Sequence, residues 1–208
     1  MKIIDIEKWS RREQYLFFKE FSDPYFSAVI PFDVAKAYNF SKTGQLPFFV
    51  VYLHACMKAL NSVENFRYRI REDNKVIVHD IIHASATISR PDFTFGFSFI
   101  GYDDDIYRFH RNFEAEKERI HSSNTLFPPQ YSDNCIYCSA LPWFDFTGYK
   151  EAFSGDRSDS VPRLAFGKYR QTNDKYSMSV SVTVHHALVD GYHLGLFVNR
   201  FQDLLNQY

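Results

Sequence analysis

The chain has 208 residues, a formal net charge of −1 at pH 7, 45% hydrophobic residues and 24% charged residues. A chain of this length forms one domain with a substantial core, and this composition is typical of a soluble globular protein. The near-zero net charge gives no electrostatic surface for nucleic acid or an anionic membrane, and no apolar run approaches the ~20 residues of a membrane-spanning helix. We therefore expect a single domain over residues 1–208, with neither a nucleic-acid nor a membrane partner.

In chain order, the first half predicts a helix at 6–21, a strand at 26–33, a short helix at 34–38, a helix at 48–61, a hairpin of strands 66–71 and 75–79, and strands at 83–89 and 93–100. Helices are expected where apolar residues recur at helical spacing, and strands where they alternate with polar ones. The hairpin turn is expected at Glu72, Asp73 and Asn74. Four phenylalanines alternate with other residues in the 93–100 stretch and predict one aromatic strand face.

The second half predicts a charged helix at 103–122, a loop at 126–133, a strand at 135–143 broken at Pro142, an exposed irregular excursion at 144–160, paired strands at 163–170 and 176–185, and a helix at 193–207. The sequence shows no repeat and no Pro- or Ser-rich linker, which agrees with a single domain. The predicted fold class is therefore α/β, with one sheet and helices along it.

Cysteine usage and the opening residues bear on the compartment. Three cysteines, at Cys56, Cys135 and Cys138, are too few for a disulfide framework. Cys135 and Cys138 form a lone CxxC in strand-like sequence, where positions three apart face opposite sides, so we interpret them as structural and expect no metal site. The opening MKIIDIEKW has acidic residues where a secretory signal needs an apolar run. These features favour a reducing cytoplasm.

The most informative stretch reads YSMSVSVTVHHALVDGY, from Tyr176 to Tyr192. Valines alternate with hydroxyl residues, and continuation of this pleat would place His185 on the hydroxyl face and His186 with the valines. Asp190 and a glycine follow at once. A histidine facing a core loses hydration and needs hydrogen-bond partners. The pattern indicates either a satisfied core histidine at a strand end or an imidazole placed for chemistry.

Four segments together resemble the chloramphenicol acetyltransferase family. HHALVDG matches its HHxxxDG motif, and the other three matches are the segments beginning at Trp9 (WSRRE), Ser139 (SALPW) and Phe166 (FGKY). They keep the family's order and spacing over residues 9–207. The shorter HxxxDG pattern also occurs in acyltransferase cores of 2-oxoacid dehydrogenase complexes, and HHxxxDG in condensation domains. An acyltransferase core of a dehydrogenase complex is disfavoured by the lack of a lipoyl domain and linker. A condensation domain is disfavoured because it is about twice this length.

The resemblance implies a two-layer sandwich of a mixed β-sheet with helices, assembled as a homotrimer with active sites between subunits. It also implies acetyl transfer from acetyl-CoA, as co-substrate and without a metal, to a hydroxyl of chloramphenicol, which inactivates the antibiotic. The resemblance assigns the general base to His186 and the hydroxyl that donates to the tetrahedral oxyanion to Ser139. A neutral imidazole suits proton removal near pH 7, and the oxyanion needs a donor. Direct attack in a ternary complex is implied, so Ser139 is not a nucleophile.

Five further residues are carried over from the resemblance. Asp190 is expected to pair with Arg11 and to hold the loop that aims the histidine, rather than to polarise its ring. Gly191 is expected to be required by a turn with little room or positive φ. Lys168 and Tyr169 match residues that line the family's coenzyme tunnel; their alternative is an ordinary edge-strand pair.

The acceptor pocket is where the chain departs from the family. Phe17 and Phe18 stand where the family has a Phe-Tyr pair. Phe97, two residues after Phe95, replaces a small residue, Tyr137 replaces an amide, and Ala165 replaces a threonine that holds a water near the oxyanion. The expected pocket residues are Phe17, Phe18, Phe95, Phe97, Tyr137 and Ala165.

Three hypotheses follow from this pattern. The first is a chloramphenicol O-acetyltransferase, and the second is an acetyl-CoA acyltransferase of the same fold that acts on another small hydroxyl or amine acceptor. The third is a non-catalytic homologue that only binds or assembles. Retention of Arg11, Ser139, His186 and Asp190 argues against the third.

Overall fold

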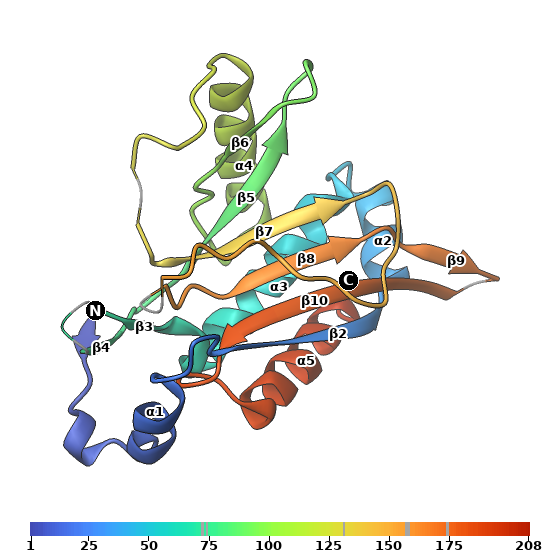
Figure 1. Ribbon diagram of the computed structural model, residues 1–208. Helices are drawn as coiled ribbons and strands as arrows, with labels where there is room; N and C mark the ends of the chain where they lie inside the picture. Colours follow the sequence, from blue (N-terminus) through green and yellow to red (C-terminus); the bar gives the residue numbers. More distant parts are fainter. Residues whose placement is uncertain (72, 74, 131, 157–158, 174) are drawn as a thin grey trace.

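The computed structural model describes residues 1–71, 73, 75–130, 132–156, 159–173 and 175–208. Its larger sheet has the strand order β2-β10-β8-β7-β5-β6, with β9 paired to β10, and a smaller sheet has the order β1-β4-β3 (Figure 1). The β5–β7 and β7–β8 pairs are parallel and the other pairs are antiparallel. The strands are β1 (Lys2–Ile3), β2 (Tyr25–Asp33), β3 (Tyr68–Ile70), β4 (Val76–Val78), β5 (His83–Ser89), β6 (Phe95–Phe97), β7 (Cys135–Leu141), β8 (Arg163–Gly167), β9 (Arg170–Thr172) and β10 (Lys175–His185).

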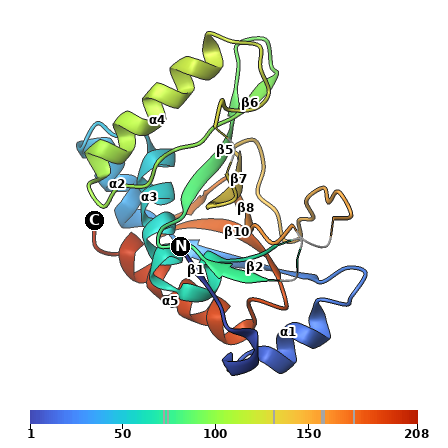
Figure 2. The same ribbon diagram turned by 90° about the vertical axis from the view of Figure 1, so that its left-hand side faces the viewer.

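Helices form the second layer on one side of the larger sheet (Figure 2). This layer contains α2 (Ala35–Thr43), α3 (Phe48–Ser62), α4 (Ile106–His121) and α5 (Gly191–Leu205). The other helices are η1 (Ile6–Lys8), α1 (Arg12–Phe18) and η2 (Glu64–Arg67), of which α1 lies apart from this layer. α3 is buried over most of its length, as its almost continuous apolar sequence requires, and it packs against α5. The predicted two-layer α/β sandwich of a mixed sheet with helices is therefore confirmed. Among the described residues, no helix combines the length and apolarity needed to cross a membrane.

The alternation in β10 sorts its side chains between the two faces of the sheet. Val180, Val182 and Val184 are fully buried in the core that also contains side chains of α3 and α5. On the opposite face, Thr183 shares a hydroxyl–hydroxyl hydrogen bond of 2.7 Å with Ser27 of β2. The hydroxyl-rich face is thus turned away from the helices, as the period-two pattern predicts.

Several predicted boundaries are wrong, each for a local reason. The helix expected at 6–21 is two short helices separated by residues 9–11. The strand expected at 93–100 shrinks to Phe95–Phe97, because Phe93 adopts a positive φ of 68° and is 97% exposed. The aromatic face is correspondingly short. The strand expected at 163–170 stops at Gly167, since the Lys168 amide donates to the Phe144 carbonyl instead of a strand partner. The hairpin strands are confirmed, while positions 72 and 74 of its turn lie outside the described residues.

The described part of the segment 144–160 runs across the sheet face opposite the helices (Figure 1). It forms no regular element in its described part, as predicted, but it is not simply exposed. Phe146 is 7% exposed and closes over Gly167, where an added Cβ would lie 3.1 Å from the Phe146 ring. Phe153 packs edge-on against Tyr25 at a centroid distance of 4.8 Å. This segment therefore builds a wall over the hydroxyl-rich face of the sheet.

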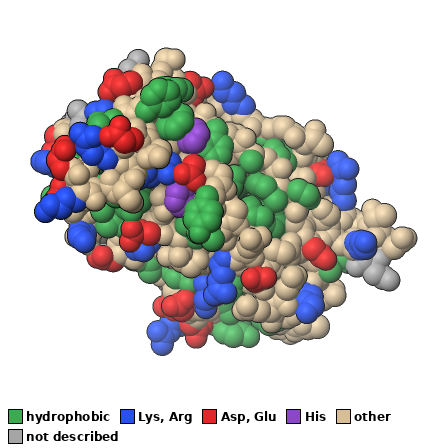
Figure 3. All heavy atoms as spheres, turned by 90° about the horizontal axis from the view of Figure 1, so that it is seen from below, with side chains coloured by type: hydrophobic (Ala, Val, Ile, Leu, Met, Phe, Trp, Pro, Cys, Tyr) green, Lys and Arg blue, Asp and Glu red, His purple; other side chains and the backbone are tan. Residues whose placement is uncertain are grey.

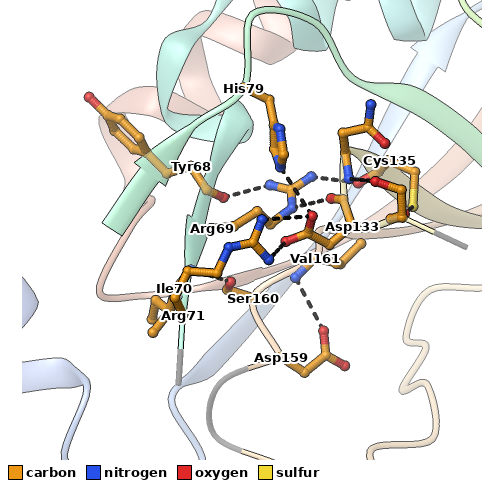
Figure 4. Close-up of polar contacts among 12 residues, drawn as sticks. Tyr68, Arg69, Ile70, Arg71, His79, Asp133, Cys135, Asp159, Ser160 and Val161 are labelled. Carbon is orange, nitrogen blue, oxygen red and sulfur yellow. Dashed lines mark hydrogen bonds and ion pairs between the residues drawn. The ribbon is translucent and has the colours of Figure 1, made fainter. Parts of the chain in front are cut away.

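A buried arginine ties the small sheet to the start of β7 (Figure 4). Arg69 is 1% exposed, and its guanidinium donates only to backbone carbonyls, those of Phe66, Tyr68, Asp133 and Cys135. Burial lowers the pKa of Arg69 to about 10. Saturation by carbonyl acceptors makes the buried cation tolerable.

All three cysteines are buried thiols. Cys138 belongs to the main core on the helix side of β7, while Cys135 donates to the Ser132 carbonyl at 3.3 Å. Burial raises the pKa of Cys135 to about 12 and raises those of Cys56 and Cys138 as well.

Candidate active site

His186 lies immediately after the last residue of β10, and stacking fixes its ring. The Phe18 ring lies parallel to it at a centroid distance of 3.8 Å and an interplanar angle of 10°, and Phe26 packs at 4.8 Å. Nδ1 is buried without a hydrogen-bond partner among the described residues, and no described side chain bonds Nε2. The neighbouring aromatic rings therefore orient this imidazole, and Nε2 is free for a ligand.

Arg11 holds the turn that carries His186. Its Nε donates to the Ala187 carbonyl and its Nη2 to the His186 carbonyl, both at 2.9 Å, while Nη1 pairs with Asp190 Oδ2 at 2.5 Å. The Arg11 side chain is 8% exposed. One guanidinium thus fixes three points of a single turn, because its planar fork presents donors in set directions.

Asp190 serves the turn and the helix that follows it. Its carboxylate accepts from the Tyr192 amide at 3.0 Å as the N-cap of α5, and it lies 2.9 Å from His193 Nδ1. Burial would raise the pKa of Asp190, but hydrogen bonding and charge from Arg11 outweigh it and the pKa is lowered. Within the described chain, Asp190 makes no hydrogen bond to the His186 ring.

The expectation for Gly191 is wrong. It is the first residue of α5, it does not have a positive φ, and an added Cβ would meet nothing within 4 Å. The turn is made by Arg11 and by the Asp190 cap, so the glycine is not needed for backbone conformation or for space within this chain.

Ser139 lies on the hydroxyl-rich face of β7 and lines a cavity of about 620 Å³. The Thr87 hydroxyl on the adjacent β5 lies 3.5 Å from the Ser139 hydroxyl. Phe97 and Tyr137, both expected in the acceptor pocket, line the same cavity, and residues of 149–154 close it on the outside. A volume of this size suits a drug-sized ligand.

Glu151 is a cavity residue that the sequence did not reveal. It lies in the segment read as an exposed excursion, where no pattern distinguishes one charged residue from its neighbours. Its carboxyl lines the cavity beside Ser139, and burial, opposed by Arg163, raises its pKa to about 7. Only the path of the segment across the sheet brings it there.

A second cavity, of about 720 Å³, contains the residues expected to contact the coenzyme. Lys168 and Tyr169 line it together with Trp143, which is 69% exposed. The Tyr169 hydroxyl lies 3.3 Å from that of Tyr38. Thr87 of β5 lines both cavities, so the two cavities adjoin at this residue, beside Ser139.

The remaining expected pocket residues are scattered. Phe17 is 63% exposed and packs against Phe18 at 5.1 Å, on the histidine side. Phe95 lies at 5.5 Å from Phe97 at the far edge of the sheet. Ala165 sits between Ser139 and Ser181 in the strand register but is fully buried and lines neither cavity.

The structure does not bring His186 and Ser139 together within one chain. Ser139 is opposite Ala165, which is opposite Ser181, and His186 follows Ser181 by five residues. At about 3.3 Å per residue and about 4.8 Å between strands, their backbones are roughly 15–20 Å apart. One substrate hydroxyl cannot touch both groups at that separation.

No group of three or more His, Cys, Asp or Glu side chains within the described ranges could hold a metal ion. The arrangement offers an imidazole, hydroxyl donors, a largely aromatic cavity with the carboxyls of Glu151 and Asp159 in its lining, and a second cavity beside a lysine.

Comparison with known proteins identifies the family. The family model described as chloramphenicol acetyltransferase matches residues 1–202. Chloramphenicol acetyltransferase 3 of Escherichia coli is 29% identical over 97% of this chain and 95% of its own length, and the Bacillus pumilus enzyme is 28% identical over 96% and 91%. A solved chloramphenicol acetyltransferase superposes with a TM-score of 0.89 at 29% identity, covering 99% of this chain and all of that one.

A more distant likeness shows the fold alone. A dihydrolipoamide acetyltransferase (E2p) from Azotobacter vinelandii superposes with a TM-score of 0.68 at 15% identity, over 88% of this chain and 81% of its own.

Because the family match extends over nearly the whole chain, this protein belongs to the chloramphenicol acetyltransferase family of acyltransferases.

Proposed function

We propose that the chain transfers acetyl from acetyl-CoA to a hydroxyl of chloramphenicol, or of a similar small acceptor, by direct attack in a ternary complex. The observation that carries the proposal is the setting of His186. Its ring is fixed by Phe18 and Phe26, its carbonyl is tied to Arg11, and Nε2 is left without a partner among the described side chains. A fixed imidazole with one open nitrogen is suited to general base catalysis.

His186 Nε2 takes the proton of the acceptor hydroxyl as the hydroxyl oxygen bonds to the thioester carbon. Ser139 donates its hydroxyl to the oxygen that gains negative charge at that carbon. When the carbon–sulfur bond breaks, the coenzyme leaves as a thiolate and receives the proton held on His186. Atoms and charge balance without a covalent enzyme intermediate and without a metal.

The separation of His186 from Ser139 supports active sites formed between subunits, and the family resemblance implies that the assembly is a homotrimer. A second copy would supply His186 opposite the cavity that holds Ser139 of the first. Lys168 and Tyr169 would bind the coenzyme in the adjoining cavity, where the exposed lysine offers a positive charge to its phosphates. Three buried free thiols agree with a reducing cytoplasm.

Glu151 favours a second candidate, a same-fold acyltransferase for another hydroxyl or amine acceptor. A carboxylate lining the cavity beside Ser139 pairs more strongly with a cationic acceptor than with a neutral antibiotic, from whose hydroxyl and amide groups it can only accept neutral hydrogen bonds.

Release of coenzyme thiol from acetyl-CoA tests the proposal, with purified full-length protein and a panel of acceptors that includes chloramphenicol. We expect acceptor-dependent release that His186→Ala abolishes. If the folded protein releases no thiol with any acceptor, the non-catalytic hypothesis replaces the proposal.

A further inference from the structure

Glu151 lines the cavity that contains Ser139, and no described residue forms an ion pair with it. Its nearest candidate, Arg163, is already paired with Asp159, and the Arg163 guanidinium lies over the Tyr25 ring at 5.0 Å. Within the ranges that the structure describes, neither a hydrogen bond nor a salt bridge reaches Glu151. The Arg163 charge therefore compensates this carboxyl only in part, and no direct partner completes the compensation.

Other charged and titratable groups around the cavity do not change this balance. Lys150 lines the same cavity but its side chain is exposed to solvent. Tyr137 and Tyr149 contribute phenol rings, and Asp159 is neutralised by Arg163. Among the described lining residues, Glu151 is therefore the carboxyl of the cavity that no salt bridge pairs, whereas Asp159 is paired with Arg163.

The walls of the cavity are aromatic. Phe97, Phe127, Tyr137, Tyr149 and Phe153 all line it, and the Arg163 guanidinium already lies over the rings of Phe153 at 5.6 Å and Tyr137 at 6.0 Å. Rings attract a cation that lies over their faces, and an ammonium group is attracted further by a carboxylate within the same cavity.

We infer that the acceptor bound beside Ser139 carries an ammonium group, which pairs with the Glu151 carboxylate while an acceptor hydroxyl or amine reaches the reacting centre. This inference rests on the proposed acetyl transfer and names its substrate class. Chloramphenicol is neutral because its nitrogen is acylated. An ammonium-bearing acceptor supplies the ion-pair partner that Glu151 lacks, and a neutral hydrogen-bond donor does not.

Two acceptors that differ at one nitrogen test the inference. They are chloramphenicol and its free amine, 2-amino-1-(4-nitrophenyl)propane-1,3-diol, which keeps the nitrophenyl ring and both hydroxyls. The parent protein should use the amine with a higher kcat/KM than chloramphenicol. In Glu151→Gln, which keeps shape and removes charge, the ratio of the two kcat/KM values should fall by about tenfold or more. Glu118→Gln, an exposed glutamate of α4 outside both cavities, is the matched control and should leave the ratio unchanged.

Calorimetric binding of the amine separates failure of this inference from failure of the proposed function. Binding of the amine that weakens in Glu151→Gln supports the inference even if no acceptor is turned over, and in that case acetyl transfer alone is rejected. An unchanged kcat/KM ratio, or amine binding that is indifferent to Glu151→Gln, overturns the inference while leaving acetyl transfer to chloramphenicol intact.

Discussion

Two adjacent histidines at the end of β10 have different surroundings. His185 is 2% exposed, its Nδ1 accepts the Ala187 amide at 3.2 Å, and its ring packs edge-on against Tyr25. His186 has an open Nε2 and stacks on Phe18. We expect His186→Ala to lower kcat by at least ~10²–10⁴-fold, because a general base contributes that much.

His185→Ala should act through the fold instead, by removing buried packing and a hydrogen bond. Urea unfolding of both variants, alongside steady-state kinetics, distinguishes the two roles. Equal losses of kcat, or a catalytic loss confined to His185→Ala, would show that the base has been assigned to the wrong ring.

Arg11 stabilises the turn through more than its ion pair with Asp190, since it also donates hydrogen bonds to two carbonyls of the turn. Removing one partner of a buried pair costs ~3–5 kcal/mol when burial is complete, and the cost is smaller here because the Asp190 side chain is 32% exposed. Arg11→Ala should therefore unfold at lower urea and lose activity, and Asp190→Asn should do so less severely. Arg11→Ala with the stability and activity of the parent would contradict a role for this arginine in the turn.

The raised pKa of Glu151 predicts a pH-dependent stability difference. A carboxyl with a pKa of about 7 in the folded chain and a usual value of 4.5 favours the protonated state on folding, so it destabilises the fold progressively as pH rises between these values. Glu151→Gln should raise the free energy of unfolding above pH 7 and leave it nearly unchanged below pH 4.5. Urea titrations at both ends of the range measure this, and an equal effect at both would refute burial of the charge.

At the scale of elements, the start of α5 is tolerant of a side chain. Gly191→Ala adds a Cβ to open space at a helix position with an ordinary φ, so stability should hold or rise by about 0.5–1 kcal/mol. A fall in stability would mean that the turn does need glycine. A fall in activity alone would point to contact with substrate or a second subunit.

The position and burial of an element could be predicted from the sequence where they depend on the periodicity of its own residues. The valine–hydroxyl alternation of β10 gave its two faces, and the apolar sequence of α3 gave its burial. The segment 144–160 was not predictable, because its position depends on contacts such as Phe146 with Gly167 that no local period encodes. For the same reason the sequence did not reveal that Glu151 lines the cavity. His186 could be predicted as the base, because the HHALVDG motif is itself a local sequence pattern.

At the scale of the molecule, the distance between His186 and Ser139 predicts complementation. Equal amounts of Ser139→Ala and His186→Ala chains, assembled together, should regain about one quarter of the parent activity, because a quarter of randomly mixed sites would combine the intact serine of one chain with the intact histidine of another. Each variant alone serves as the control. Activity no greater than the mean of the two controls would place both groups in one subunit and require a rearrangement of β10.

The buried thiols have a practical consequence for following the chain in solution. These thiols have raised pKa values, so they stay protonated at neutral pH, and they are shielded from solvent. Such a thiol reacts with an alkylating dye only when the surrounding core opens. The dye used to detect liberated coenzyme should therefore leave the native protein unlabelled for the length of an assay. Over hours, slow labelling of Cys56 in α3 would report the rate of global opening. Labelling of Cys135 would report opening at the start of β7, which is an interior strand of the sheet, so the two thiols measure unfolding at two places in the chain.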